Sequence, residues 1–279
     1  MENEPLILVS STDSYSDTWE PFFTLLEKNI DNITDYRIFL LSDTKSYNGH
    51  SFVNNIQVSN NNEVLSWSER VLRALDRLDS EIVFLLFDDY FLMSKLNEDK
   101  FKRFYNIICN NKNIANLRLI HEKKSFPSSY DDLNIVKNLI GYKNSLMPGF
   151  WRKEDLINIM QIGESPWQFE LLGTIRTYFY PKTFLVINEQ PSNKIYNFPF
   201  SGGIIKGKWV LDEYNKITQI TGLILDTKRG FIIWDPNKNK YLRKFTLFKN
   251  SLKNKKLIIN SILFMFNNII KIMYARFKK

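Results

Sequence analysis

Cysteine and histidine are scarce in this sequence, which has one cysteine, Cys109, and two histidines, His50 and His121, among 279 residues. A single cysteine excludes an internal disulfide framework, and these three residues are too few for a Cys/His zinc cluster. The N-terminal stretch MENEPLILVSSTD also lacks the basic flank and the long apolar run of a secretory signal. We therefore expect a cytoplasmic protein.

Acidic residues are absent from the C-terminal end. From residue 236 to 279 there are 12 Lys or Arg and no Asp or Glu. Because the whole chain carries a net charge of +8, the remainder carries about 8 − 12 = −4. The basic charge thus belongs to a tail, whereas proteins that bind nucleic acid spread it over a folded face among stacking aromatic residues. We do not expect nucleic acid as a partner.

Strands and helices alternate in the first 120 residues. Four short apolar runs are typical of strands: 5–12, 36–43, 81–87 and 113–120. Three segments between them carry apolar residues at helical spacing: 18–29, 62–78 and 99–110. This order predicts an α/β fold, with a mixed, mostly parallel sheet covered by helices on both faces.

The helix over 62–78 is expected to begin at Asn62, a possible cap. Its apolar residues fall on one helical face: Val64, Trp67, Val71, Leu75 and Leu78.

The second half of the chain is less regular. Residues 122–134 are polar and loop-like, and 145–181 combine turns with two amphipathic helical stretches, which we expect to close over a substrate. Residues 190–209 are rich in Gly, Pro and Asn and predict loops.

Two adjacent acids, Asp88 and Asp89, end the most hydrophobic run of the first half, FLLF. An uncompensated charge there costs several kcal/mol. In sheets of this type ligands bind beyond the carboxyl ends of the strands, which also places Asp13 and Asp43 nearby. A divalent cation holding a diphosphate, or the hydroxyls of a sugar, would offset the cost. An Asp that caps a neighbouring loop or helix is the alternative.

The tail contains a helical pattern over 257–274. Its five polar residues fall within about 120° of arc at 100° per residue: Asn260, Ser261, Asn267, Asn268 and Lys271. A wide apolar face with a narrow polar stripe and basic ends is typical of an amphipathic helix at the surface of an anionic membrane. Packing against its own domain or a second subunit is the other interpretation.

Three stretches resemble the bacterial GT-A type glycosyltransferases that build capsule and O-antigen polysaccharide: LILVSSTDSYSDTWEPFF, SWSERVLRALDRLDSEIVFLLFDDYFL and SLMPGFWRKEDLINIMQIGESPWQFELLG. The resemblance covers roughly residues 5–235. It implies a GT-A-like, Rossmann-like catalytic domain over 1–235, with a nucleotide-sugar-binding half (1–120) and an acceptor half (121–235). Residues 236–279 would form a basic amphipathic tail that associates with a membrane.

The resemblance also implies a donor site. In such enzymes the first strand and its loop hold the nucleoside, which implicates Asp13, Tyr15 and Asp43. The helix before the acidic pair faces the donor, which makes Trp67 and Arg70 candidates for contact with the nucleotide or the diphosphate. The donor is expected to be a nucleotide sugar, with a UDP-linked sugar as the candidate.

The metal of this family is held by an Asp-x-Asp motif. This chain departs from that motif, because Asp88, Asp89 and Tyr90 follow one another. A late histidine, which often completes the metal shell, is also missing. Mn²⁺ or Mg²⁺ on Asp89 and Asp88 is therefore an open expectation.

Glycosyl transfer needs a base for the acceptor hydroxyl, and a carboxylate is suited to this. By the resemblance, Glu170 in GESPWQFE sits where inverting enzymes place that base, and Trp167 offers an aromatic face for an acceptor sugar. A Glu favoured by the helix dipole and a core Trp are the alternatives.

Two further basic positions are candidates for phosphate contact. Arg152 lies in MPGFWRKEDL, although it could equally face water. Lys206 or Lys208 could reach a diphosphate from SGGIIKGK (201–208), which lacks the ending of a Walker motif and has no helix clearly following.

These features together predict an inverting glycosyltransferase of surface polysaccharide synthesis. It would act on a lipid-linked glycan acceptor, as a peripheral protein on the inner face of the cytoplasmic membrane, with Asp88 and Asp89 managing the diphosphate. Two alternatives remain open: a nucleotidyltransferase, although SSTDSYSD lacks the Gly-rich basic loop of that class, and a non-catalytic glycan-binding or assembly protein on the same fold.

Overall fold

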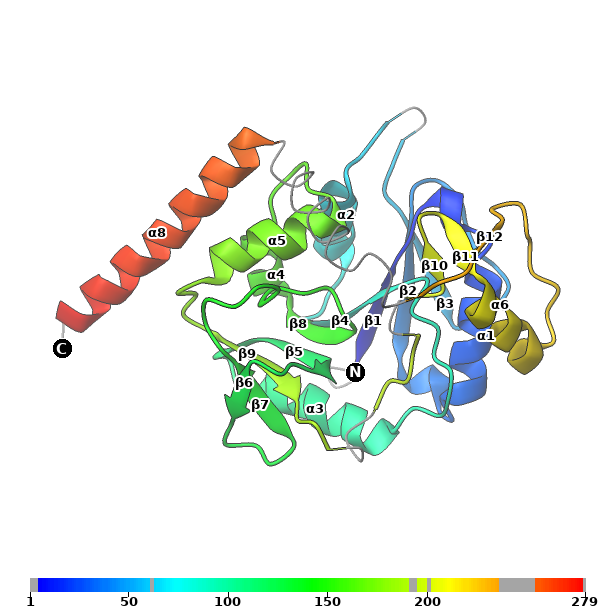
Figure 1. Cartoon of the computed structure of the whole chain (residues 1–279), viewed down its shortest axis with the longest axis horizontal. Helices are drawn as coiled ribbons and strands as arrows, with labels where there is room; N and C mark the ends of the chain where they lie inside the picture. The colour runs from blue at the N-terminus through cyan, green and yellow to red at the C-terminus, as the bar shows by residue number, and fades with distance from the viewer. Residues whose placement is uncertain (1–4, 61–62, 191–194, 200–201, 236–253, 278–279) are drawn as a thin grey trace.

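A nine-stranded mixed sheet forms the centre of the molecule (Figure 1). The computed structural model describes residues 5–60, 63–190, 195–199, 202–235 and 254–277, and for residues 275–277 it describes the backbone alone. The strands of this sheet are β1 (Leu6–Ser10), β2 (Arg37–Ser42), β3 (Val53–Gln57), β4 (Ile82–Phe87), β5 (Ile114–His121), β6 (Ser125–Pro127), β7 (Leu133–Val136), β8 (Gly149–Arg152) and β9 (Thr183–Ile187). A second sheet contains β10 (Ile204–Ile205), β11 (Lys208–Val210) and β12 (Phe231–Ile232).

The order of the large sheet is β3-β2-β1-β4-β8-β5-β9-β7-β6. β1, β2, β3 and β4 pair in parallel, and so do β5 and β9. Among the nine strands of this sheet, β7 and β8 are antiparallel to the other seven. This arrangement confirms the predicted fold class, a mixed and mostly parallel sheet.

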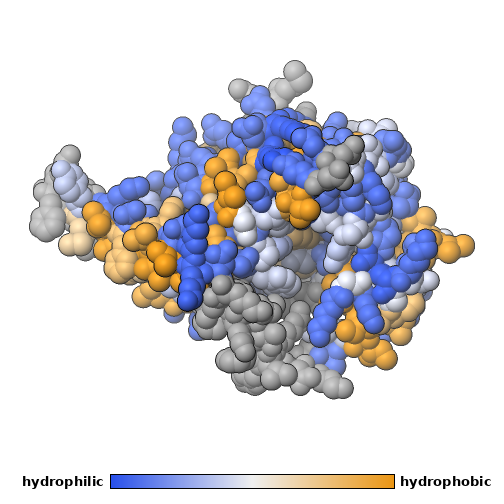
Figure 2. Space-filling view, turned by 90° about the horizontal axis from the view of Figure 1, so that it is seen from above, coloured by the Kyte–Doolittle hydropathy of each residue, from blue (hydrophilic) through white to orange (hydrophobic). Residues whose placement is uncertain are grey.

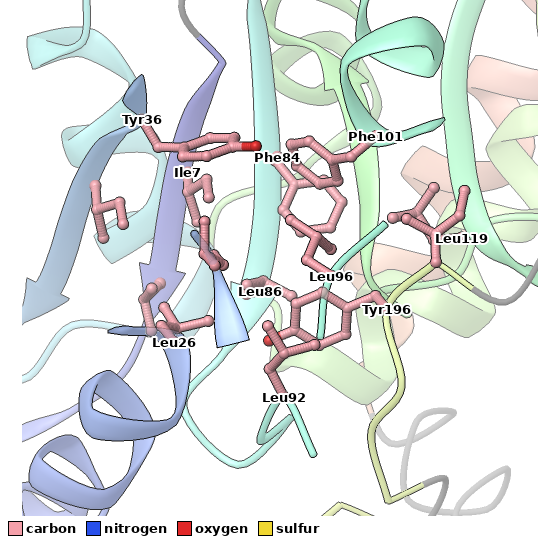
Figure 3. Close-up of a cluster of buried hydrophobic side chains, with 14 of the residues drawn as sticks. Ile7, Leu26, Tyr36, Phe84, Leu86, Leu92, Leu96, Phe101, Leu119 and Tyr196 are labelled. Atoms are coloured by element: carbon pink, nitrogen blue, oxygen red, sulfur yellow. The ribbon is translucent and has the colours of Figure 1, made fainter. Parts of the chain in front are cut away.

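Helices cover both faces of the sheet. They are α1 (Trp19–Asn29), α2 (Trp67–Arg77), α3 (Glu98–Asn110), α4 (Lys153–Ile159), α5 (Pro166–Thr177), α6 (Leu211–Thr221) and α8 (Lys255–Phe277). Successive residues of a strand point to opposite faces. Ile7 and Val9 therefore pack with α1 and α3, in the cluster of Figure 3, whereas Leu6 and Leu8 pack with α2, α4 and α5. Burial on both sides explains why the central strands are continuously apolar.

The start of α2 differs from the expectation. The helix begins at Trp67, and Ser66 caps it in a reciprocal pair of hydrogen bonds with Glu69, a capping box. Val64 precedes the helix and is 97% exposed, so it does not share the buried face, whereas Trp67, Val71, Leu75 and Leu78 do. The expected cap, Asn62, lies outside the described residues.

The second half contains more strand than its sequence suggests. The segment 122–134, expected to be a loop, contains β6 and the start of β7. β6 lies at the edge of the sheet, which is where a strand tolerates a proline such as Pro127. Strand β8 inserts between β4 and β5 and separates them. The predicted absence of a helix after SGGIIKGK is also wrong, because α6 follows β11 directly.

The predicted helix of the tail is confirmed as α8, which packs along α5 and projects from the body of the molecule (Figure 1). By length and composition, its segment Lys255–Tyr274 could cross a membrane. The first part of the expected tail, 236–253, lies outside the described residues.

Candidate functional site

Asp88 follows the end of β4, with its side chain 4% exposed. Its Oδ2 accepts hydrogen bonds from Ser11 Oγ and, at 3.2 Å, from Thr18 Oγ1. Trp19 Nε1 in turn donates to Ser11 Oγ at 2.7 Å. Burial, reinforced by the neighbouring Asp89, raises the pKa of Asp88 to about 8, and the hydroxyl groups of Ser11 and Thr18 offset only part of this shift. The apolar strand thus ends in a carboxyl group held by the loop and helix that follow β1.

Asp89 lies beneath the small sheet. The Gly203 amide donates to Asp89 O at 2.9 Å, and a Cβ atom added at Gly202 would stand 2.5 Å from Asp89 Oδ2. Gly202 has a φ of +76°, a conformation that other residues rarely adopt. Burial raises the pKa of Asp89 to about 7, although the amides of Asp89 and Ile204 and the charge of Arg229 act against the shift. The two glycines therefore let the chain cover this carboxylate closely.

Arg229 is the cation of this site, and sequence reasoning missed it. Its Nε donates to Asp17 Oδ2 at 2.6 Å, its Nη1 donates to Gly207 O at 3.0 Å, and its guanidinium lies 4.6 Å from the ring centroid of Tyr15. The positive charge of Arg229 opposes the rise of the pKa of both Asp88 and Asp89, without reversing it. Only the tertiary fold brings this residue to the loop after β1, and no spacing in the sequence signals it.

Tyr15, a predicted donor contact, lies beside the acidic pair. Burial raises the pKa of its hydroxyl, and the charges of Asp88 and Asp89 raise it further. The phenol is half-buried under Arg229. An aromatic ring, a guanidinium and two carboxyl groups therefore meet at the carboxyl end of β4.

Asp13 and Asp43 join the loops after β1 and β2. The Asp13 carboxylate accepts from the amides of Asp43, Thr44 and Lys45 at 3.0–3.1 Å, and the Asp13 amide donates to Asp43 Oδ2 at 3.0 Å. Arg70 Nη1 donates to Asp43 Oδ1 at 3.1 Å. Burial works to raise the pKa of Asp13, but these hydrogen bonds together outweigh it and lower the pKa. The predicted proximity of Asp13 and Asp43 is confirmed, and both carboxylates stabilise the loops.

Two expected ligand contacts do not fit their surroundings. Trp67 is 5% exposed, stacks on Phe87 and packs at a tilt against Phe169. Its Nε1 donates to Ser10 Oγ at 3.1 Å, so protein surrounds the ring. Arg152 pairs with Ile82 at the opposite end of β4 from Asp88. It is 3% exposed and donates to backbone carbonyls at the end of α3, where the helix dipole favours a cation. Arg152 is therefore a helix cap rather than a phosphate ligand.

Glu170 lies on α5, where its Oε1 accepts from Leu146 N at 2.8 Å and from Ser145 Oγ at 3.0 Å. No hydrogen bond from a described residue reaches its Oε2. Burial raises the pKa of Glu170 above the ordinary value, although these donors and the charge of Arg118 oppose the shift. A carboxylate of this kind can accept a proton near neutral pH.

Tyr90 connects Glu170 with the acidic pair. Burial raises the pKa of the Tyr90 hydroxyl, and the charges of Asp89 and Glu170 raise it further, so both carboxylates lie within electrostatic range of one phenol. The Tyr90 ring packs between Phe87 and Phe198.

The remaining predicted residues lie on the surface. Trp167 is 49% exposed in the first turn of α5, one turn before Glu170, and Lys208 is exposed where β11 begins. Sequence reasoning also missed Arg118, which is 1% exposed near Glu170, with Nε and Nη2 lacking hydrogen-bond partners among the described residues.

A metal ion would have few protein ligands at this site. Within the part of the chain that the structure describes, no group of three or more His, Cys, Asp or Glu side chains could hold one. Asp88 and Asp89 supply two carboxyl groups, which is enough for Mg²⁺ when substrate phosphates and water complete the shell.

Comparison with known proteins gives no matching family and no matching curated protein. Among solved structures, the chain is similar to residues 1–349 of S. aureus TarS, with a TM-score of 0.49 and 14% identity over 93% of this chain and 81% of that one. The same part of TarS in complex with UDP-GlcNAc gives a TM-score of 0.47 and 15% identity, covering 92% of this chain and 79% of TarS. Its complex with UDP gives 0.47 and 14%, over 81% and 67%. We therefore argue the function from the residues of this chain.

Proposed function

We propose that this protein is a GT-A type glycosyltransferase, which moves one sugar from a nucleotide sugar to a glycan acceptor, with inversion at the anomeric carbon. One observation carries the proposal. The buried Asp88 and the partly buried Asp89 lie at the carboxyl end of a buried strand beside Arg229, and Tyr90 lies within electrostatic range of both Asp89 and Glu170. The site thus offers separate groups for a diphosphate and for an acceptor hydroxyl.

Glu170 acts as the base in this proposal. Its Oε2 takes the proton of the acceptor hydroxyl while the acceptor oxygen bonds to the anomeric carbon. The bond from that carbon to the diphosphate oxygen breaks, and its electron pair leaves with the nucleoside diphosphate. Because only the ionised base can take the proton, its raised pKa makes the rate rise with pH through that value.

Arg229 and the acidic pair hold the diphosphate. The guanidinium, fixed by Asp17, provides a positive charge that stabilises the leaving group. Asp89 and Asp88 would hold a divalent cation, which when bound neutralises part of the charge of the diphosphate. Tyr15 and Arg70 line the loops on which the nucleoside would lie, with Asp13 and Asp43 shaping those loops rather than presenting free carboxylates.

The test measures donor binding and transfer by the purified full chain. A panel of nucleotide sugars, beginning with UDP-linked ones and including UDP-GlcNAc, is screened for thermal stabilisation and then for release of nucleoside diphosphate. We expect one donor to stabilise the protein and to be turned over. A nucleotidyltransferase would instead need added pyrophosphate and would convert it, with the nucleotide sugar, into nucleoside triphosphate and sugar phosphate, and a binding protein would form none of these products.

Two substitutions then separate the roles. Glu170→Gln should lower turnover about 10²- to 10³-fold with donor affinity kept, and should abolish the rise of rate with pH. Asp89→Asn should weaken donor binding as well. Glu189→Gln and Asp31→Asn are matched controls, because these side chains are 82% and 71% exposed, and neither should change turnover. Unchanged turnover in both site variants would contradict the proposal.

A further inference from the structure

Helix α8 packs on the body of the protein with a side that includes two of its polar residues. Ser261 is fully buried and Asn268 is 5% exposed, although both are polar. Arg176 Nη1 donates to Ser261 Oγ at 2.7 Å, and Asn268 Nδ2 donates to Arg176 O at 3.1 Å. Phe264 stacks on Tyr180 beside these contacts, at 6.4 Å between centroids. Part of the polar stripe, Ser261 and Asn268, therefore faces α5.

Arg176 fixes this orientation through a buried ion pair. Its Nη2 donates to both carboxylate oxygens of Glu164, at 2.7 and 2.8 Å, and both side chains are fully buried. Glu164 N in turn donates to Ser68 Oγ at 2.9 Å, at the start of α2. Rotation of α8 would remove a partner from a buried guanidinium, which is costly. The rotation of α8 about its axis is thus set by a network that reaches the donor side of the sheet.

The opposite side of α8 is apolar and faces outward (Figure 2). Six residues, which we name the outer face of α8, are between 38% and 60% exposed: Ile259, Ile262, Leu263, Phe266, Ile270 and Met273. At 100° per residue they fall within about 100° of arc, centred about 180° from the buried residues Leu257, Ser261, Phe264 and Asn268. An apolar stripe of this length needs a partner.

We propose that the outer face of α8 lies in the interface of an anionic phospholipid membrane, with the helix parallel to the surface. Charge identifies this occupant. Lys255, Lys256 and Lys271 are exposed on the helix, and residues 236–279 carry 12 Lys or Arg and no acidic residue. Such a segment is attracted to acidic headgroups while its apolar face enters the acyl boundary.

Two other occupants fit less well. A spanning helix would have to leave α5 and expose Ser261 and Asn268 to lipid, which would leave the Arg176 side chain without its Ser261 partner. A second copy of the chain would bring one segment of 12 cations against another, and like charges destabilise an interface.

Docking through α8 also orients the candidate acceptor side, a step that rests on the proposed function. Trp167 and Glu170 lie on α5, the helix to which α8 is bonded. The bonded helices would hold these residues at a constant height above the membrane. An acceptor carried on a lipid fits that geometry, because its sugar extends from the same surface.

The experiment measures sedimentation of the full chain with lipid vesicles. Vesicles of phosphatidylglycerol and phosphatidylcholine in equal parts are compared with vesicles of phosphatidylcholine alone. We expect binding to the acidic vesicles only, weakened by salt. The triple variant Ile259→Gln, Phe266→Gln, Ile270→Gln should bind the acidic vesicles at least about tenfold more weakly. Its thermal unfolding should be unchanged, because these side chains are already half exposed.

The matched control removes as much apolar surface elsewhere. Val64→Gln, Ile224→Gln and Ile233→Gln alter side chains that are 97%, 101% and 82% exposed, and this triple variant should bind like the unchanged protein. Three results would overturn the proposal. They are equal binding to neutral vesicles, resistance of membrane-bound protein to alkaline carbonate extraction, and a lipid-free dimer that the α8 variant abolishes.

Donor stabilisation is measured on the same samples. If the protein does not bind vesicles but a donor still stabilises it, only the membrane proposal for α8 fails. If the protein binds acidic vesicles but no nucleotide sugar stabilises it, only the proposed function fails.

Discussion

Two pairs of acids follow strands of the same sheet and have opposite properties. Asp13 and Asp43 lie on exposed loops, where backbone amides and Arg70 satisfy their oxygens, and the pKa of Asp13 is lowered. Asp88 and Asp89 end a strand that is buried on both faces, and their pKa values are raised to about 8 and 7. Hydrogen-bond donors lower the pKa of Asp13, whereas loss of water raises the pKa values of Asp88 and Asp89.

This difference separates a structural role from a ligand-binding one. The carboxylates of Asp13 and Asp43 already have partners, so a ligand gains little from them. Asp88 favours its protonated form near neutral pH, and Asp89 exchanges its proton there, so a cation or a donor that restores their charge gains interaction energy. The acidic pair is therefore where a ligand changes the protein most.

The largest expected effect is the pH dependence of stability, measured by thermal unfolding of the ligand-free chain. The folded state holds the proton of Asp88 after the unfolded chain has released it, so stability should fall as pH rises from about 4 to about 8. A shift from 3.8 to about 8 sets an upper limit of about 6 kcal/mol for this fall, at about 1.4 kcal/mol per pKa unit.

Asp88→Asn should reduce the slope and leave the part that Asp89 causes, and Asp13→Asn should leave it unchanged. An equal slope in the Asp88 variant would mean that Asp88 does not cause it.

The next effect concerns the close cover over Asp89. Gly202→Ala adds a methyl group 2.5 Å from Asp89 Oδ2, which should push β10 away and weaken donor binding about tenfold or more. Gly207→Ala is the matched control, because its φ of +74° causes the same backbone strain while its surroundings are open. Isothermal titration with the donor found in the panel measures both. If both variants lose the same donor affinity, backbone strain and not the methyl group beside Asp89 causes the loss.

The smallest effect is expected at Asp13. Asp13→Asn keeps an oxygen acceptor but loses the charge that strengthens four hydrogen bonds, at a cost of about 1–2 kcal/mol at pH 7. Because the pKa of Asp13 is lowered in the folded state, the difference should shrink as the pH falls and should vanish below that lowered pKa. Urea denaturation over a series of pH values from 7 into the acid range checks this. A change in donor turnover larger than the change in stability would give Asp13 a direct ligand role.

Local patterns predicted the first half of the fold well. The apolar runs became β1, β2, β4 and β5, and helical spacing placed Trp19, Phe22, Phe23 and Leu26 of α1 in the core. β8 was missed, because GFWR is too short for its period to be read and because its pairing with β4 and β5 joins distant segments. The same limit applies to Arg229, which reaches the acidic pair from a position 140 residues after Asp89 in sequence.

Burial was harder to predict than position. The family resemblance implied that Trp67 faces a nucleotide, because the helix before the acidic pair faces the donor in such enzymes, yet Phe87 and Phe169 pack against its ring. The polar residues of the tail were expected to form one stripe. The structure divides them, with Ser261 and Asn268 on α5 and Asn260, Asn267 and Lys271 exposed. A helical wheel gives angles between residues and does not give the direction of the protein body.

The amino-acid sequence by itself determined the α/β class, the acidic pair at a strand end and the basic amphipathic tail, because each follows from periodicity, composition or adjacency in the chain. Only the tertiary structure decided that Arg229 accompanies the pair, that Trp67 is a core residue and that α8 turns its apolar face outward. These features depend on which surfaces exclude water from one another, and that is settled by contacts between residues far apart in the sequence.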